Sequence, residues 1–82
     1  MPNVERSDQF IFLFSKIKNK AEQERIDKQI RKIIESPEIG KPMRYGRKGT
    51  REAYIGSFRL SYAYFKEENK LVFLDLYHKD EQ

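Results

Sequence analysis

The spacing of apolar residues changes once along this chain, near Pro37, and that change constrains the fold more than any other feature. Before Pro37, apolar side chains recur every three or four residues, as they do on one face of an α-helix. After it, Val, Ile, Tyr and Phe gather in short runs separated by glycine, which is typical of β-strands. We therefore expect an α+β domain whose N-terminal helices pack on a sheet formed by the C-terminal half.

Two helices are predicted before Pro37. Ser7 and Asp8 offer N-cap chemistry for the first helix, and the second extends over about 20–35. Pro37 ends the second helix because the residue before a proline resists the α conformation. The predicted buried positions are Phe10, Leu13, Phe14, Ile17 and Ala21 in the first helix and Ile26, Ile30, Ile33 and Ile34 in the second. Ile11 and Phe12 lie off this face, and they either extend the core or form an exposed apolar patch for a partner.

Three strands are predicted at 51–55, 58–65 and 71–77, with a two-residue turn at Gly56-Ser57 between the first two. Weaker strand signals lie at 2–6 and 43–45. The expected order is (β)-α-α-β-β-β, with two N-terminal helices on one face of a small antiparallel sheet. Because no repeat or linker divides the sequence, residues 1–82 are expected to form a single domain.

The expected register of the last hairpin decides which side chains share a face. The pairs expected on the helix side are Leu60 with Leu76, Tyr62 with Leu74, and Tyr64 with Val72. The pairs expected on the open side are Arg59 with Tyr77, Ser61 with Asp75, and Ala63 with Phe73. A slip of one residue would send every side chain to the other face. The register is expected to bring Arg59, Tyr77, His78 and Lys79 together at one rim of the open face.

The composition excludes several classes of site. The chain has no cysteine and one histidine, so disulfides, thiolate metal clusters and a His-rich zinc site are not expected, and neither is a cofactor. No apolar run approaches the roughly 20 residues that span a bilayer. The N-terminal residues lack the pattern of an export signal. We expect a cytoplasmic protein without a membrane partner.

The positive charge is concentrated in one segment. Six of the 17 Lys and Arg residues, but one of the 13 Asp and Glu residues, lie between positions 41 and 59. A basic segment of this kind attracts polyanions such as nucleic acids. The alternative interpretation is a solvated loop that keeps the protein soluble.

Several segments of the sequence resemble the RelE/ParE superfamily of type II toxins, and together they cover nearly the whole chain. They are Ser7-Asp8 before the first helix, Ser-Pro-Glu-Ile-Gly-Lys-Pro-Met-Arg at 36–44, Gly-Ser-Phe-Arg-Leu-Ser-Tyr at 56–62, and the run from 71 that ends in Leu-Tyr-His-Lys at 76–79. The resemblance implies a cognate antitoxin that blocks the active face. RelE-like members cut mRNA in the ribosomal A site without metal, by attack of the 2′-OH on the adjacent phosphate. ParE-like members share the fold but inhibit DNA gyrase.

The resemblance also implies roles for single residues. Arg59 matches the strand arginine that contacts the scissile phosphate, and Lys79 matches a basic position at the end of the last strand. Tyr77-His78 resembles the ending of the YoeB branch, in which histidine and tyrosine transfer protons. That branch has a glutamate base where this chain has Lys41, so the general base stays open between His78 and Tyr77.

The leading hypothesis is a RelE-like, ribosome-dependent mRNA endoribonuclease that inhibits translation, with ribosome, mRNA and antitoxin as partners. Its candidate catalytic residues are Arg59, Tyr77, His78 and Lys79. Its candidate RNA-binding residues are Lys41, Arg44, Arg47, Lys48 and Arg51, with Tyr54 or Phe73 stacking on a base. The alternatives are a ParE-like gyrase inhibitor and an inactive relative that only binds antitoxin or RNA.

Overall fold

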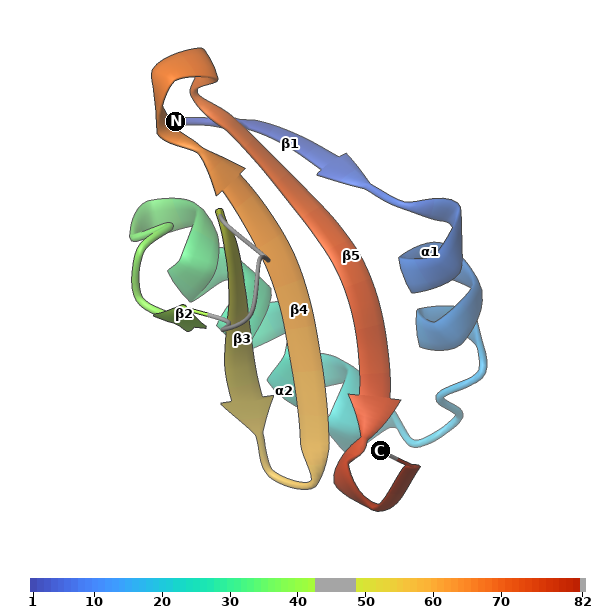
Figure 1. Ribbon diagram of the computed structural model, residues 1–82. Coiled ribbons are helices and arrows are strands. Elements are labelled where there is room, and N and C mark those ends of the chain that lie inside the picture. The colour runs from blue at the N-terminus through green and yellow to red at the C-terminus, as the bar shows by residue number, and fades with distance from the viewer. Residues whose placement is uncertain (43–48, 82) are drawn as a thin grey trace.

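The computed structural model describes residues 1–42 and 49–81, which form a five-stranded sheet and two α-helices (Figure 1). In chain order the elements are β1 (Asn3–Arg6), α1 (Asp8–Ser15), α2 (Lys20–Glu35), β2 (Lys41–Pro42), β3 (Thr50–Ile55), β4 (Phe58–Phe65) and β5 (Lys70–His78), with 3-10 turns η1 (Lys66–Glu68) and η2 (Lys79–Glu81). The α+β prediction is confirmed, including the weak first strand. The strand predicted at 43–45 lies outside the described residues.

The strands lie side by side in the order β1-β5-β4-β3-β2. Neighbours are antiparallel except β1 and β5, which run parallel. The sheet is therefore mixed, and the expectation of a purely antiparallel sheet is wrong on this one pair. A parallel pair needs a long connection, and here both helices and three strands separate β1 from β5 along the chain.

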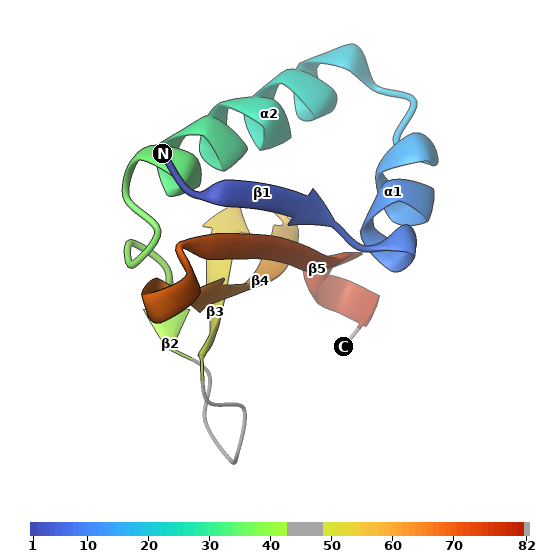
Figure 2. The ribbon, with the colours of Figure 1, turned by 90° about the horizontal axis from the view of Figure 1, so that it is seen from above.

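Both helices contribute to the core on one face of the sheet. Figure 2 shows α2 extending along that face and α1 beside the end of β1 and β5. The fully buried side chains include Phe10 from α1, Ile26, Ile30 and Ile33 from α2, and Leu60, Tyr62, Leu71, Phe73 and Leu76 from the sheet. The predicted isoleucine face of α2 is confirmed, whereas Ile11 and Phe12 are 51% and 55% exposed. No helix in the described ranges is long and apolar enough to cross a membrane.

The helix ends follow their capping residues. The Ser7 hydroxyl accepts the Phe10 N–H at 3.0 Å, as predicted for an N-cap. The helix α1 stops at Ser15, since the Lys16 N–H bonds back to the carbonyls of the last turn and the Asn19 side chain begins α2. Ile17 therefore lies in the connection between the helices and Ala21 lies in α2, where it is exposed, so the single long stripe predicted through them is interrupted.

The β4–β5 register is confirmed at one end and wrong at the other. The predicted partners Arg59–Tyr77, Leu60–Leu76 and Ser61–Asp75 are observed, but Tyr62 then pairs with Phe73 instead of Leu74. A β-bulge leaves Leu74 as the extra residue, which changes the side of the sheet on which the preceding side chains lie. Leu71 and Phe73 consequently face the helices in place of Val72 and Leu74.

Tyr62 connects the sheet core to the segment that follows α2. Its buried hydroxyl donates to the Pro37 carbonyl at 2.9 Å and accepts the Gly40 N–H at 2.9 Å. A Cβ on residue 40 would lie 2.6 Å from that hydroxyl oxygen and 2.9 Å from a ring carbon, so only glycine fits there. This contact fixes the chain directly before Lys41 and β2.

We expect Tyr62→Phe to lower the free energy of unfolding by about 1–3 kcal/mol, because it leaves Gly40 and Pro37 without their buried partner. Burial raises the pKa of Tyr62, against the opposing effects of the Gly40 hydrogen bond and the Arg51 charge. The folded protein thus holds this proton above pH ~10, where the unfolded chain releases it. The contribution of the protonated Tyr62 hydroxyl to the free energy of unfolding is therefore present below pH ~10, and it is lost as the pH rises toward the folded pKa. Urea unfolding between neutral and alkaline pH tests this.

The control for that experiment is Tyr54→Phe, since Tyr54 is 54% exposed. We expect the Tyr54 variant to keep the alkaline loss of stability and the Tyr62 variant to lose part of it. Identical pH profiles for the two variants would contradict the role assigned to the Tyr62 hydroxyl.

Candidate active site

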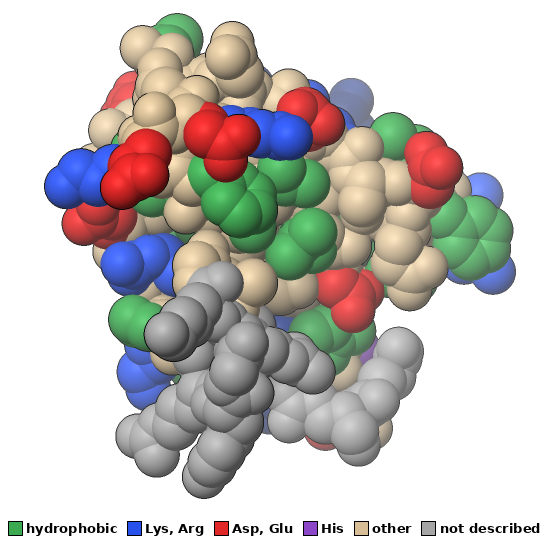
Figure 3. Space-filling model, turned by 45° about the horizontal axis from the view of Figure 1, so that its top comes forward, with side chains coloured by type: hydrophobic (Ala, Val, Ile, Leu, Met, Phe, Trp, Pro, Cys, Tyr) green, Lys and Arg blue, Asp and Glu red, His purple; other side chains and the backbone are tan. Residues whose placement is uncertain are grey.

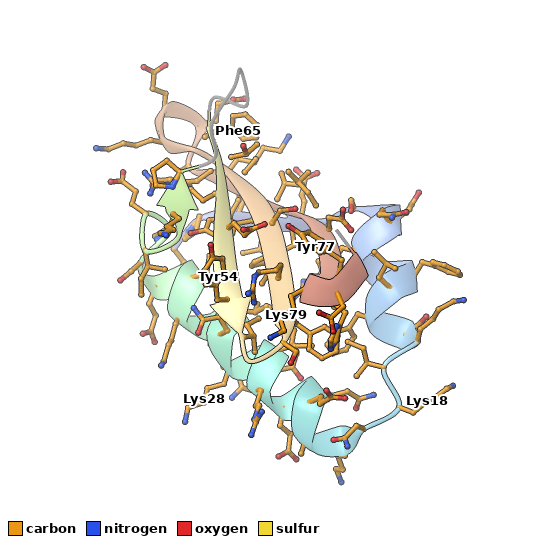
Figure 4. The ribbon with its side chains drawn as sticks, turned by 60° about the horizontal axis from the view of Figure 1, so that its bottom comes forward. Lys18, Lys28, Tyr54, Phe65, Tyr77 and Lys79 are labelled. Atoms are coloured by element: carbon orange, nitrogen blue, oxygen red, sulfur yellow. The ribbon has the colours of Figure 1, made fainter. Side chains whose placement is uncertain are left out.

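Arg59 lies on the face of the sheet that the helices leave uncovered. In the strand register it is opposite Tyr77 of β5 on one side and Tyr54 of β3 on the other, and Figure 4 shows the two tyrosines on either side of β4. The guanidinium carbon lies 4.1 Å from the centre of the Tyr54 ring. The Nη1 group also donates to the carbonyls of Gly56 and Phe58, at 3.2 and 3.1 Å. These contacts hold the cation over the open face, beside Tyr77 as the sequence predicted.

A carboxylate that the sequence reasoning missed completes this face. The Tyr77 hydroxyl donates a hydrogen bond to the Glu52 side chain. Glu52 pairs with Ser61 of β4, and the small serine between β3 and β5 leaves room for the reach across. The available signal was that Glu52 is the one acidic residue between positions 41 and 59.

Lys41 joins the same face from the edge strand β2. It is opposite Glu52 in the register, and its ammonium lies 5.7 Å from the centre of the Tyr54 ring. We call these side chains the open-face cluster, and its members are Lys41, Glu52, Tyr54, Arg59 and Tyr77. It combines two cations, a carboxylate and two phenols on the sheet face that the helices leave uncovered; Lys41 and Tyr54 are exposed and the other three are half-buried.

His78 does not join the open-face cluster, so the expected convergence of its imidazole with Arg59 is wrong. Successive side chains of a strand point to opposite faces. The ring packs edge-on against Phe58 at 5.5 Å between ring centres, and Nδ1 lies 3.5 Å from the Asp80 carboxylate. It lines a hollow of about 540 Å³ next to the α1–α2 connection.

Lys79 lies beyond the end of β5, against the β3–β4 turn. Its backbone N–H donates to the Ser57 carbonyl at 2.7 Å. Its side chain lines a hollow of about 310 Å³ together with Arg25 of α2. The structure thus brings Lys79 to the turn next to Arg59, on the side that faces α2.

The other predicted RNA-binding residues have different positions. Arg51 faces the helix side, where its guanidinium donates to the carbonyls of Glu38 and Gly40 at 2.9 and 2.8 Å. Phe73 is fully buried, so the prediction that it stacks on a base is wrong. Arg44, Arg47 and Lys48 lie outside the described residues. Within the described ranges, no three His, Cys, Asp or Glu side chains are grouped so that they could hold a metal ion.

The sheet order and the bare face that carries Arg59 define the class of fold: the chain has the fold of the RelE toxins. No protein-family model and no curated protein matches the sequence. Among solved structures, the isolated Escherichia coli RelE toxin is 15% identical with a TM-score of 0.81, over 95% of this chain and 84% of that one.

Two toxin–antitoxin complexes contain chains with the same fold. The match in the Mycobacterium tuberculosis RelBE2 complex is 24% identical with a TM-score of 0.79, over 95% of this chain and 99% of that one. The match in the archaeal RelE–RelB complex of Pyrococcus horikoshii is 16% identical with a TM-score of 0.76, over 99% and 98%. The RelE-like resemblance seen in the sequence is therefore confirmed at the level of the fold.

Proposed function

We propose that this protein is the toxin of a type II toxin–antitoxin system and that it cleaves mRNA on the ribosome, in the cytoplasm. The observation that carries the proposal is the position of Arg59, held on a bare sheet face beside the Tyr77–Glu52 hydrogen bond. The RelE fold supports the toxin assignment, and the solved RelBE complexes support an antitoxin protein as its partner.

The open-face cluster offers the groups that cleavage by a 2′-OH requires. The new bond joins O2′ to phosphorus, the bond from phosphorus to O5′ breaks, and negative charge builds on the phosphate oxygens. Arg59 stabilises that charge as a preorganised donor. Tyr77 accepts the 2′-OH proton while it passes its own proton to Glu52, and the leaving O5′ takes a proton from water. In this relay Tyr77, and not His78, acts as the general base.

The remaining cluster residues would bind the substrate. The half-exposed Tyr54 ring is suited to stack on a base. Lys41 would contact the RNA backbone, as would Arg44, Arg47 and Lys48 of the same basic segment. The ribosome would supply the alignment of the reacting groups, which is worth several kcal/mol in such reactions.

We expect Tyr77→Phe and Glu52→Gln each to lower the rate of mRNA cleavage on purified ribosomes by roughly 10²-fold, the low end for a lost acid–base group. Because the two groups act as one relay, the double variant should be no slower than either single variant. Cleavage rates from primer extension measure this. Glu24→Gln, a change of the same chemistry on the exposed side of α2, serves as the control. Cleavage at the full rate by Tyr77→Phe would remove the relay from the mechanism.

The activity itself is tested by inducing the wild-type chain and mapping the ends of ribosome-bound mRNA. Ends within the A-site codon support the proposal. Intact mRNA together with DNA damage would overturn it in favour of a ParE-like gyrase inhibitor. Growth without any defect would overturn it in favour of an inactive relative.

A further inference from the structure

Three cationic side chains surround the two-residue turn that joins β3 to β4. From the open face, Arg59 donates to the Gly56 carbonyl at 3.2 Å. From the helix side, Nη1 of Arg25 lies 3.5 Å from the position that a Cβ on Gly56 would take. The end of β5 brings Lys79 to the same turn through its hydrogen bond to Ser57. We call Arg25, Arg59 and Lys79 the turn cations.

Within residues 1–42 and 49–81, no hydrogen bond or ion pair of the Arg25 and Lys79 side chains explains their convergence. Both side chains are exposed and line the same hollow of about 310 Å³. Neither forms an ion pair with a carboxylate of the described residues, although Glu22 also lines that hollow. On the side of the molecule seen in Figure 3, by contrast, acidic and basic side chains lie next to one another. Unpaired cations that share a hollow create a local potential that attracts an anion.

The shape of the turn suits a strand that passes over it. Gly56 has a φ of +56° and carries no side chain, so nothing from this residue stands between Arg59 on one side and Arg25 on the other. The hollow itself has Ile55 and Phe58 among its lining residues. An extended chain with a charge on every unit would meet Arg59 first and then Arg25 and Lys79.

We propose that Arg25 and Lys79 bind a second phosphate of a single-stranded RNA, on the far side of the β3–β4 turn from Arg59. This inference rests on the proposed function, because it takes the strand held at Arg59 as its starting point. It changes the role predicted for Lys79, which then binds a neighbouring phosphate and not the scissile one. Arginine and lysine are the side chains that bind nucleic-acid phosphates through charge and N–H donors.

The test measures binding of the purified chain to a 2′-O-methyl RNA of roughly 8 nucleotides, a site size within the range of small single-strand binders. This RNA has no free 2′-OH and cannot be cleaved. For single strands, each phosphate contact contributes about 0.7 to the slope of log affinity against log salt. Because both side chains bind the same phosphate, we expect the double variant Arg25→Gln with Lys79→Gln to lower the slope by about 0.7, and each single variant to lower it by part of that amount.

Matched controls come from the same helix. Arg31→Gln and Lys28→Gln remove the same charges from exposed positions of α2, and Figure 4 shows Lys28 projecting away from the sheet. Both controls should keep the wild-type slope. If Arg25→Gln and Lys79→Gln also keep it, the second phosphate site does not exist. If these variants instead lose binding of a polyglutamate peptide while RNA binding is unchanged, the hollow binds an acidic protein segment and the proposal is overturned.

The outcome separates this inference from the proposed function. A slope that depends on Arg25 in a protein that leaves ribosomal mRNA intact would support the second phosphate site and remove the nuclease. Cleaved mRNA with unchanged slopes would support the nuclease and remove the second phosphate site.

Discussion

Replacing Arg59 with alanine is expected to lower mRNA cleavage on the ribosome by about 10²–10³-fold, the usual effect of removing one preorganised donor to a developing negative charge. The protein should stay folded. The guanidinium is stacked on an exposed ring and bonded to carbonyls at the surface, and a cation–π contact of this kind is worth about 0.5–1 kcal/mol. Cleavage rates, growth after induction and thermal unfolding measure the three effects.

Two further variants sharpen the Arg59 experiment. Arg59→Lys keeps the charge but loses the planar fork and its stacking on Tyr54, so its cleavage rate should be intermediate. Arg31→Ala removes an arginine from the exposed side of α2 and should cleave like the wild type. Growth arrest that persists unchanged in Arg59→Ala would remove Arg59 from the mechanism.

Phe73→Ala is expected to produce the largest loss of stability, about 3–5 kcal/mol. Phe73 is 0% exposed, and its ring centre lies 5.7 Å from that of Phe10 and 6.1 Å from that of Tyr62. The residue thus joins α1 to the centre of the sheet. Because small domains have about 5–15 kcal/mol in total, this one truncation removes a large share of it. Chemical denaturation with urea measures the change.

The matched control is Phe12→Ala, which truncates a ring that is 55% exposed. It should change the free energy of unfolding by less than about 0.5 kcal/mol, as is usual at the surface. If Phe73→Ala were as stable as the wild type but bound RNA more weakly, Phe73 would be a base-stacking residue and its assignment to the core would be wrong.

The predicted register of β5 is wrong at residues 71–74 for two reasons, one within the strand and one far along the chain. Residues 71–74 are all apolar, so their alternation carries no information about which of them face the helices. The bulge at Leu74 is supported from far along the chain. The Ser7 hydroxyl donates to the Leu74 carbonyl at 2.7 Å, and the Ser7 N–H donates to the Phe73 carbonyl at 2.9 Å. Those bonds depend on β1 lying beside β5, which no residue pattern within the hairpin indicates.

In the candidate site, too, the contacts within one hairpin were predicted and the contacts between more distant segments were missed. Arg59 and Tyr77 were predicted to lie together because burying Leu60 against Leu76 leaves the neighbouring pair on the other face of the sheet. Glu52 was missed because its bond to Tyr77 crosses the whole width of β4. Arg25 was missed because α2 must first pack on the sheet before its side chain reaches the β3–β4 turn.

The sequence by itself determined the two helices, the N-cap of the first, the Gly56-Ser57 turn and the pairing of Arg59 with Tyr77. Each of these depends on neighbours within a few residues or within one hairpin, where propensity and periodicity decide the conformation. Only the tertiary structure decided the parallel pairing of β1 with β5, the bulge at Leu74, the reach of Tyr77 to Glu52 and the convergence of Arg25 and Lys79. These depend on contacts between segments far apart in the chain, which form when the core is packed.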